Sequence, residues 1–322
     1  MTLIWLNAKH GDKHNVTALS CQREALMFKT VLAHLTGTDC DQSVLATALR
    51  LVRPFAGHIE GLRVVPDPAA MAAQALPFDT AIGMTMVLSD VLDTIERQSQ
   101  ERTQRARTTL SEFCKMQDVP YADAPPGPGH VSAAWREGNA ADEWDHIIGA
   151  TRFHDLVVLS GGKERPGRSP AELLGSVVVS SGRPVVLAPE KPSEGPIKTI
   201  AVAWKDTAEA ARALTAAMPL LAQAERLEVL SANEKDSQVK QCLDCSDSVV
   251  QQLRWHGLNA HGHFIIPAGR SIPNAILDSA RGLNADLLVM GGYGHSRLRE
   301  FVFGGVTQRI LQGIDIPVFL FH

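Results

Sequence analysis

The stretch that decides the fold lies near the end of the chain: Gly291-Gly-Tyr-Gly-His-Ser-Arg-Leu-Arg-Glu-Phe-Val-Phe-Gly-Gly-Val-Thr307. It follows the apolar run Leu287–Met290 and precedes a run with helical character that ends at Gly313. The order is therefore strand, glycine-rich loop and helix. Glycines after a parallel strand let backbone N–H groups converge, and the N-terminus of the next helix adds the positive end of its dipole. The stretch therefore predicts a phosphate-binding site.

The strand that precedes this loop, and several others, occur twice in the chain. The matching pairs are Lys29–Leu35 with Lys198–Trp204, Asp155–Leu159 with Asp286–Met290, and Arg183–Leu187 with Ile316–Phe321. These strands are apolar throughout and alternate with helical segments, which is typical of parallel sheets covered by helices on both faces. The sequence therefore predicts an α/β fold with an internal repeat, whose ligands bind beyond the carboxyl ends of the strands.

The repeat predicts two domains, as the length of 322 residues also suggests at roughly 100–200 residues per domain. We expect an N-terminal extension at 1–26, a first domain at 27–189, a short Pro/Gly/charged linker at 190–196 and a second domain at 197–322. The extension is interpreted as a loosely held arm, or as a segment upstream of a true start at Met27.

Spacing of apolar residues predicts the individual elements. Helices are expected at residues 41–55, 82–116, 133–149, 208–222, 249–256 and 272–282, and strands at 26–35, 58–65, 155–159, 183–189, 198–204, 226–231, 262–266, 286–290 and 316–321. Acidic and basic residues are interleaved in the long segment 82–116, so we interpret it as a helix with a solvated face. The alternative is a partner-binding lid over the first domain.

Composition limits the class of partner. The formal net charge is −4, which does not favour nucleic acid or an anionic membrane as a partner. No apolar run approaches the ~18 residues of a membrane helix, and the N-terminus lacks the layout of a signal peptide. Five scattered cysteines are typical of a reducing compartment. We therefore expect a cytoplasmic protein without a nucleic-acid or membrane partner.

With these features, residues 27–322 resemble a tandem universal stress protein. The family's nucleotide-binding branch carries the motif Gly-x2-Gly-x9-Gly-(Ser/Thr), and Gly291, Gly294 and Gly304 have that spacing. The resemblance implies two Rossmann-like domains of the adenine nucleotide alpha hydrolase type, each with a mainly parallel five-stranded sheet. It further implies a role in stress response with little or no catalysis, and pairing through the last strands, either within the chain or in a homodimer.

The resemblance also implies a ligand, which is ATP, ADP or AMP, with or without Mg²⁺. The residues implied in binding are Gly291, Gly294, His295, Gly304, Gly305, Val306, Thr307, Lys205 and Asp206. Gly305 stands where the family has Ser or Thr, and loss of that hydroxyl removes a hydrogen bond worth about 0.5–1.5 kcal/mol. Lys205 stands where an aspartate contacts the nucleoside, and Asp206 follows it. Lysine cannot accept a hydrogen bond, so Asp206 substitutes for that aspartate or nucleoside recognition is weaker.

Several of these residues also have simpler interpretations. His295 either touches phosphate or lies in a solvated loop, and Lys205 is either a point charge for phosphate or a solvated lysine. Thr307 either caps the last helix or reaches a phosphate. The glycines themselves could serve only tight turns.

The first copy of the motif is degenerate. Ser160 replaces the first glycine, and the loop Leu35–Thr38 lacks the nucleoside carboxylate, although Gly175-Ser176 retains a Gly-Ser pair. The segment after Gly175 is also shorter than its counterpart, which predicts a shortened helix. We therefore expect the first domain not to bind nucleotide in the family's manner.

Two alternatives to nucleotide binding stay open at this point. One is a scaffold that binds partners rather than nucleotide, and the other is a slow ATP hydrolase in which Asp206 is the nearby carboxylate. Cys242-Leu-Asp-Cys245 is a single CxxC without a second pair, so we interpret it as two loop cysteines rather than a metal or redox site.

Overall fold

The computed structural model describes residues 27–67, 85–124, 129–140, 142–161, 170–232, 239–267, 269–292 and 314–322. The predicted extension at 1–26 lies outside these residues, as does most of the glycine-rich stretch, at 293–313. Within the described residues, no helix is both long enough and apolar enough to cross a membrane.

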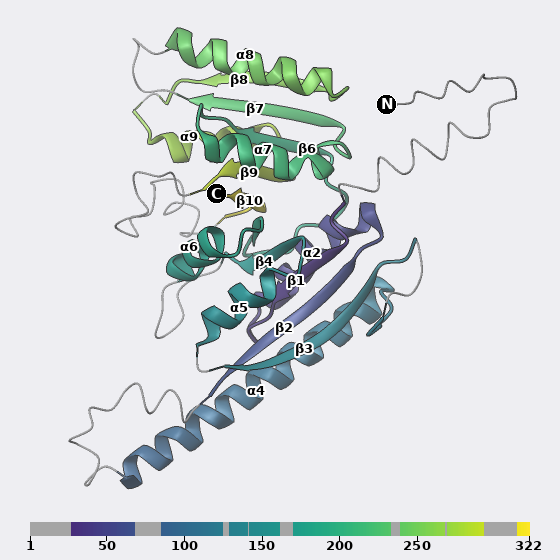
Figure 1. Cartoon of the computed structure of the whole chain (residues 1–322), viewed down its shortest axis with the longest axis vertical. Helices are drawn as coiled ribbons and strands as arrows, with labels where there is room; N and C mark the ends of the chain where they lie inside the picture. The colour runs from purple at the N-terminus through teal and green to yellow at the C-terminus, as the bar shows by residue number, and fades with distance from the viewer. Residues whose placement is uncertain are drawn as a thin grey trace, which may run out of the picture.

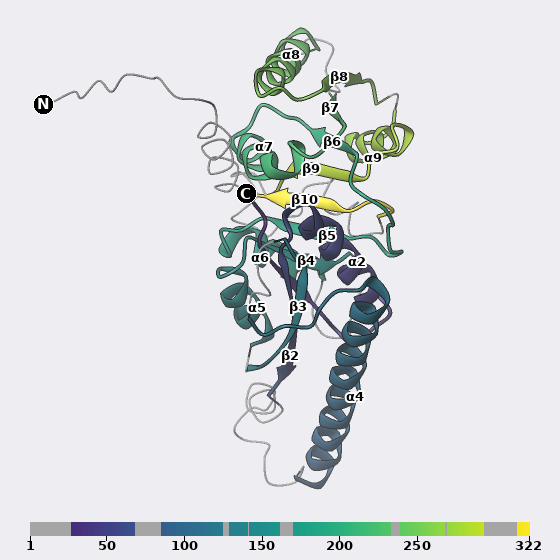
Figure 2. The same cartoon turned by 90° about the vertical axis from the view of Figure 1, so that its right-hand side faces the viewer.

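One ten-stranded sheet runs through the described structure, in the order β3-β2-β1-β4-β5-β10-β9-β6-β7-β8 (Figures 1 and 2). The strands are β1 (Thr30–His34), β2 (His58–Pro66), β3 (Ser132–Ala140), β4 (Leu156–Ser160), β5 (Val185–Ala188), β6 (Thr199–Ala203), β7 (Arg226–Ala232), β8 (Ala260–Ile265), β9 (Leu287–Gly291) and β10 (Val318–Phe321). The order 3-2-1-4-5 recurs in the second half as 8-7-6-9-10. The sheet therefore confirms the predicted α/β fold and shows that the two copies share one sheet.

Helices cover both faces of this sheet (Figure 1). They are α2 (Asp41–Val52), the short η1 (Arg53–Phe55), α4 (Thr85–Gln117), α5 (Glu143–Thr151), α6 (Pro170–Ser180), α7 (Ala208–Leu221), α8 (Val239–Trp255) and α9 (Ile272–Gly282). Residues of α2, α4, α7 and α8 belong to one hydrophobic core, and residues of α5, α6 and α9 belong to the other. Each core includes strand residues from both halves of the chain, because the sheet is continuous.

The two halves join through their last strands. β5 and β10 pair antiparallel, with Val318 opposite Leu187 and Leu320 opposite Val185, whereas the other pairs of named strands are parallel. Phe319 is fully buried in this seam, and its ring lies 6.3 Å from that of Phe28 in the first half. Each half therefore covers the exposed edge of the other, which is the arrangement that an unpaired strand edge favours.

An aspartate fixes the start of the central strand in each half. Asp155 Oδ2 accepts hydrogen bonds from the backbone N–H groups of Lys29 and Thr30, at 2.7 and 2.9 Å. Asp286 Oδ2 accepts the equivalent bonds from Lys198 and Thr199, both at 2.9 Å. The sequence repeat is thus also a repeat of contacts, and it sets where β1 and β6 begin beside β4 and β9.

Asp286 has a further side-chain partner, and among the described residues Asp155 has no equivalent arginine. Arg50, on α2 of the first half, donates from Nη2 to Asp286 Oδ1 at 3.3 Å and from Nε to the carbonyl oxygen of Gly195 at 2.8 Å. The Arg50 side chain is 8% exposed. Burial lowers the pKa of its guanidinium, and the Asp286 carboxylate partly opposes that effect. Arg50 therefore links the first half, the connecting segment and the start of β9.

The predicted helix at 133–149 is wrong in its first part. Residues 132–140 form β3, which pairs in parallel with the whole of β2, and the helix α5 begins only at Glu143. Asp142 caps α5 by accepting hydrogen bonds from the N–H groups of Trp144 and Asp145. Alanine-rich sequence favours helix locally, but pairing with a long neighbouring strand outweighs that preference.

The seam between the halves generates the first prediction. Replacing Phe319 with alanine removes a fully buried ring, so the free energy of unfolding should fall by about 3–5 kcal/mol. Urea denaturation measures this, and Phe153→Ala is the control because that ring is 81% exposed. Equal effects of the two substitutions would contradict the assigned role of the seam.

A second prediction compares the two aspartates. Asp155→Ala and Asp286→Ala both release two backbone N–H groups, but only Asp286→Ala also leaves the buried Arg50 without its carboxylate. Asp286→Ala should therefore cost about 1–3 kcal/mol more in the free energy of unfolding. Urea denaturation of both variants checks this difference, and its absence would show that the Arg50 contact contributes nothing measurable.

Candidate functional site

The switch point of the second half lies between β6 and β9. The connection after β6 runs through α7 on one face of the sheet, while β9 is reached through α9 on the other face. β6 is followed in sequence by its neighbour β7 on one side, and β9 by its neighbour β10 on the other, so the strand order reverses here. Open α/β sheets bind ligands at the carboxyl ends of the strands at such a point. Ala203 ends β6 and Gly291 ends β9 at this edge.

Gly291 lies directly against the first turn of α7. A Cβ at this position would lie 2.6 Å from the backbone nitrogen of Ala210 and 2.7 Å from the carbonyl carbon of Glu209. Both are backbone atoms, so a side chain would force the strand and helix apart. The glycine is therefore required by a close approach between the end of β9 and the N-terminal turn of α7, and not by a turn of its own.

The remaining loop residues of the predicted site are not described. Gly294, His295, Gly304, Gly305, Val306 and Thr307 lie outside the described residues. Gly292, the last described residue before them, donates its N–H to the carbonyl oxygen of Phe321 at 2.8 Å. The loop therefore leaves from a point held between β9 and β10.

Lys205 and Asp206 lie in the connection between β6 and α7, and both side chains are exposed. Asp206 Oδ2 accepts a weak hydrogen bond from Cys245 Sγ at 3.8 Å, which ties this connection to α8. Partial burial and the neighbouring Asp206 carboxylate raise the pKa of the Cys245 thiol, which favours the protonated donor. Thr207 caps α7 by accepting from the N–H of Ala210. The structure therefore places a carboxylate in the connection that leaves β6 at the same edge of the sheet as Gly291, one residue after the lysine.

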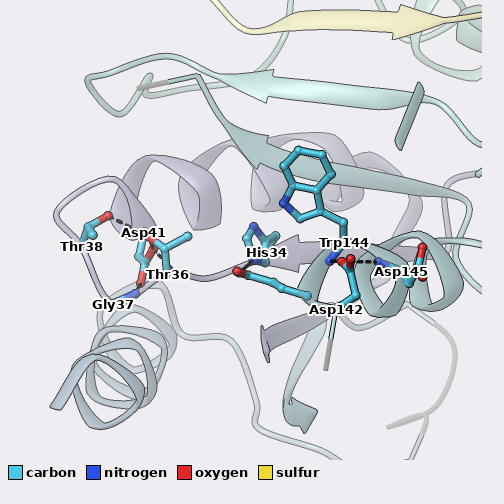
Figure 3. A network of polar contacts seen from close by, with 9 residues as sticks. His34, Thr36, Gly37, Thr38, Asp41, Asp142, Trp144 and Asp145 are labelled. Atoms are coloured by element: carbon cyan, nitrogen blue, oxygen red, sulfur yellow. Dashed lines mark hydrogen bonds and ion pairs between the residues drawn. The ribbon is translucent and has the colours of Figure 1, made fainter. Parts of the chain in front are cut away.

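The same edge of the first half is occupied by its own side chains (Figure 3). The fully buried Asp41 accepts hydrogen bonds from the N–H groups of Thr36 and Gly37, both at 2.8 Å, and from Thr36 Oγ1 at 3.1 Å. Residues 35–38 of the connection after β1 contain no carboxylate, as predicted, but the exposed Asp39 follows them and Asp41 at the start of α2 binds their N–H groups. Its oxygens already accept three bonds, which fix this connection in place.

His34 fills the neighbouring position at the end of β1, and the sequence did not single it out. It is 2% exposed, and its Nε2 lies 3.4 Å from Glu143 Oε1 at the start of α5. Figure 3 shows His34 between the Thr36–Asp41 connection and the first turn of α5. In the second half, the match of Lys29–Leu35 with Lys198–Trp204 places Ala203 at the equivalent position. This substitution is a sequence signal that could have indicated a filled edge.

The Gly-Ser pair of the first half does not start a helix. α6 begins at Pro170, so Gly175 and Ser176 lie within it and cannot offer N–H groups of its first turn. Ser160 ends β4, and Gly161 donates to the carbonyl oxygen of Ala188 at 3.0 Å. Our interpretation of Gly175-Ser176 as a retained part of the loop motif is therefore wrong.

The cysteine pair was also placed wrongly. Cys242 and Cys245 lie on α8 and not in a loop. Among the residues that the structure describes, no group of three or more His, Cys, Asp and Glu side chains is arranged to hold a metal ion. His263 donates to or accepts from Glu228 at 2.5 Å, so it belongs to an ion-pair cluster at the start of β7 and β8.

Comparison with known proteins gives a family for the end of the chain and a fold for nearly all of it. Residues 246–322 match the Universal stress protein family. No curated protein matches the sequence.

Three solved structures resemble the chain over most of its length. A universal stress protein from Archaeoglobus fulgidus DSM 4304 is 16% identical, with a TM-score of 0.60, and the match covers 92% of this chain and 97% of that one. A protein of unknown function from Pseudomonas aeruginosa PAO1 is 13% identical, with a TM-score of 0.54, covering 93% and 94%. A putative universal stress protein from Pseudomonas aeruginosa UCBPP-PA14 is 12% identical, with a TM-score of 0.52 and the same coverage.

These similarities agree with the repeat in the sequence and the order of strands in the sheet. The segment from Ser246 to His322 thus matches the universal stress protein family, and the chain as a whole has the fold of solved universal stress proteins.

Proposed function

We propose that this protein acts in stress response and binds ATP, or the related ADP or AMP, at the carboxyl edge of β6 and β9, with little or no catalysis. The observation that carries the proposal is the contact of Gly291 with the first turn of α7. The spaced glycine motif of the sequence begins at that residue, at the switch point of its half. We propose that the nucleotide site lies in the second domain, 197–322, and not in the first, 27–189.

The part of the proposed site that would bind the phosphates has the stronger support. Gly291 brings the end of β9 within van der Waals contact of the α7 backbone, so phosphates bound there lie near a helix N-terminus. Gly294 and Gly304 follow at the family's spacing, and the N–H groups of Gly304, Gly305 and Val306 are the proposed donors. Gly305 has no hydroxyl, so backbone groups make these contacts without a side-chain partner.

The part of the proposed site that would bind the nucleoside depends on Asp206. Its carboxylate is exposed at the same edge and is held by Cys245 of α8, so it can accept hydrogen bonds from ribose hydroxyls or adenine. Lys205 is exposed beside it and can approach phosphate as a point charge. A bound Mg²⁺ would be held mainly by phosphate oxygens and water, which is its usual mode beside nucleotides.

The first half supports the assignment by contrast. At its edge, His34 lies against Glu143, and Asp41 accepts hydrogen bonds from the connection that precedes it. We therefore propose one nucleotide per chain. The scaffold alternative draws its support from Lys205, which replaces the aspartate of the family motif.

Calorimetric titration with ATP and Mg²⁺ tests the phosphate half. We expect about one site per chain and a loss of at least about tenfold in affinity in Gly294→Asp, because a carboxylate in the loop repels phosphate. Gly162→Asp, in the corresponding loop of the first half, is the matched control and should leave the affinity unchanged. Absence of heat with the unchanged protein would exclude nucleotide binding and leave the scaffold alternative.

A separate comparison tests the nucleoside half. Asp206→Ala should weaken ATP binding by about tenfold or more, as expected for hydrogen bonds to a charged group. It should not weaken binding of inorganic triphosphate, which has no nucleoside. Equal losses for both ligands would show that Asp206 acts on the phosphates or on the loop. Phosphate release should stay near background, and a turnover that Asp206→Ala abolishes without loss of binding would instead favour the hydrolase alternative.

A further inference from the structure

A cavity lies on the side of the sheet covered by α2 and α4, near the start of β9 and not at its carboxyl end. Its volume is about 660 Å³, within the roughly 300–1,000 Å³ typical of small-molecule sites. It opens between α2, the last turns of α4 and the connecting segment 192–196. α2 and the C-terminal end of α4 lie side by side in both views of the molecule (Figures 1 and 2).

One wall of this cavity is apolar. Ala46 and Leu49 contribute it from α2, and Phe113 and Met116 contribute it from α4. Met116 is 67% exposed. An exposed methionine at the mouth of an apolar wall is the kind of adaptable surface that accommodates an aliphatic chain.

The cavity is also lined by two guanidinium groups and one carboxylate. Arg50 and Arg53 line the cavity together with Glu194, and Arg50 is also paired with Asp286. Arg53 is exposed, whereas Arg50 is buried. Arg50 Nη1 is buried and has no hydrogen-bond partner among the residues that the structure describes. A buried donor without an acceptor is costly, and an anionic oxygen is the acceptor that a guanidinium prefers.

An apolar wall beside a positive group is complementary to an amphipathic anion. We propose that this cavity binds an aliphatic carboxylate of medium length, with its carboxylate toward Arg50 and Arg53 and its chain along the wall formed by α2 and α4. A small inorganic anion would leave the apolar wall exposed to water, and a cation would be repelled by the two arginines. Neither fits both sides of the cavity.

The same ligand acts on the link between the two halves. Arg50 already donates to Gly195 in the connecting segment and to Asp286 at the start of β9. A carboxylate beside this guanidinium binds only when α2, the connecting segment and β9 are assembled. It therefore stabilises the folded chain in proportion to its concentration above the dissociation constant.

Calorimetric titration of the full chain with octanoate tests the proposal, using 1-octanol as the uncharged probe of the same length. We expect one saturable site per chain for octanoate and an affinity at least about tenfold weaker for 1-octanol. Ala46→Trp, which fills the cavity, should weaken octanoate binding by at least about tenfold. Its control, Ala211→Trp, adds the same ring at an exposed position of α7 and should bind as the unchanged protein does.

A second pair of variants avoids any change in the packed part of the wall. Met116→Asp places a negative charge at the mouth and should weaken octanoate binding at least about fivefold, while Thr108→Asp, exposed elsewhere on α4, should not. The proposal is overturned if octanoate shows no saturable binding. It is also overturned if octanoate and 1-octanol bind with equal affinity, or if each variant binds octanoate as tightly as its control does. No nucleotide is present in these titrations, so their outcome does not depend on the nucleotide site.

Discussion

Two backbone N–H groups at the start of each central strand donate to a single carboxylate, that of Asp155 in the first half and Asp286 in the second. These contacts fix β1 beside β4 and β6 beside β9. In a buried sheet, a shift of one residue would turn every side chain to the opposite face. The register therefore also decides that Gly291, and not Met290, meets the first turn of α7 at the far end of β9. The proposed nucleotide edge depends on a contact at the other end of the strand.

The two halves share the same strand order, but different side chains lie at the carboxyl ends of their central strands. In the first half, Asp41 accepts the N–H groups of its own connection and His34 lies against Glu143, so polar groups at this edge bind one another. In the second half, Ala203 occupies the position matching His34, and Asp206 remains exposed with only a thiol as its described donor. Hydrogen bonds among the polar groups of an edge stabilise that edge, but they occupy the acceptors that a ligand would need. This difference explains why we assign one nucleotide per chain to a protein with two similar halves.

The sequence predicted what depends on local pattern and repetition. The paired strands at Asp155–Leu159 and Asp286–Met290 were identified because buried parallel strands are apolar throughout and their repeat is direct. β3 was predicted as helix, since alanines favour helix locally and only the neighbouring β2 makes a strand of them. The contact of His34 with Glu143 joins residues of different elements, so no spacing in the sequence indicates it, although the replacement of His34 by Ala203 in the second half shows that the two edges differ. The glycine loop itself lies outside the described residues, and its assignment still depends on motif spacing.

The contact of Arg50 with Asp286 links the cavity to the strand that ends at the proposed nucleotide site. Asp286 precedes β9 and Gly291 ends it, so the arginine link and the nucleotide edge lie at opposite ends of one short, buried strand. A carboxylate bound beside Arg50 and a nucleotide bound beside Gly291 would both favour the conformation in which β9 is seated between β6 and β10. Linkage requires that any such effect be reciprocal: if one ligand strengthens the other, the second strengthens the first by the same factor.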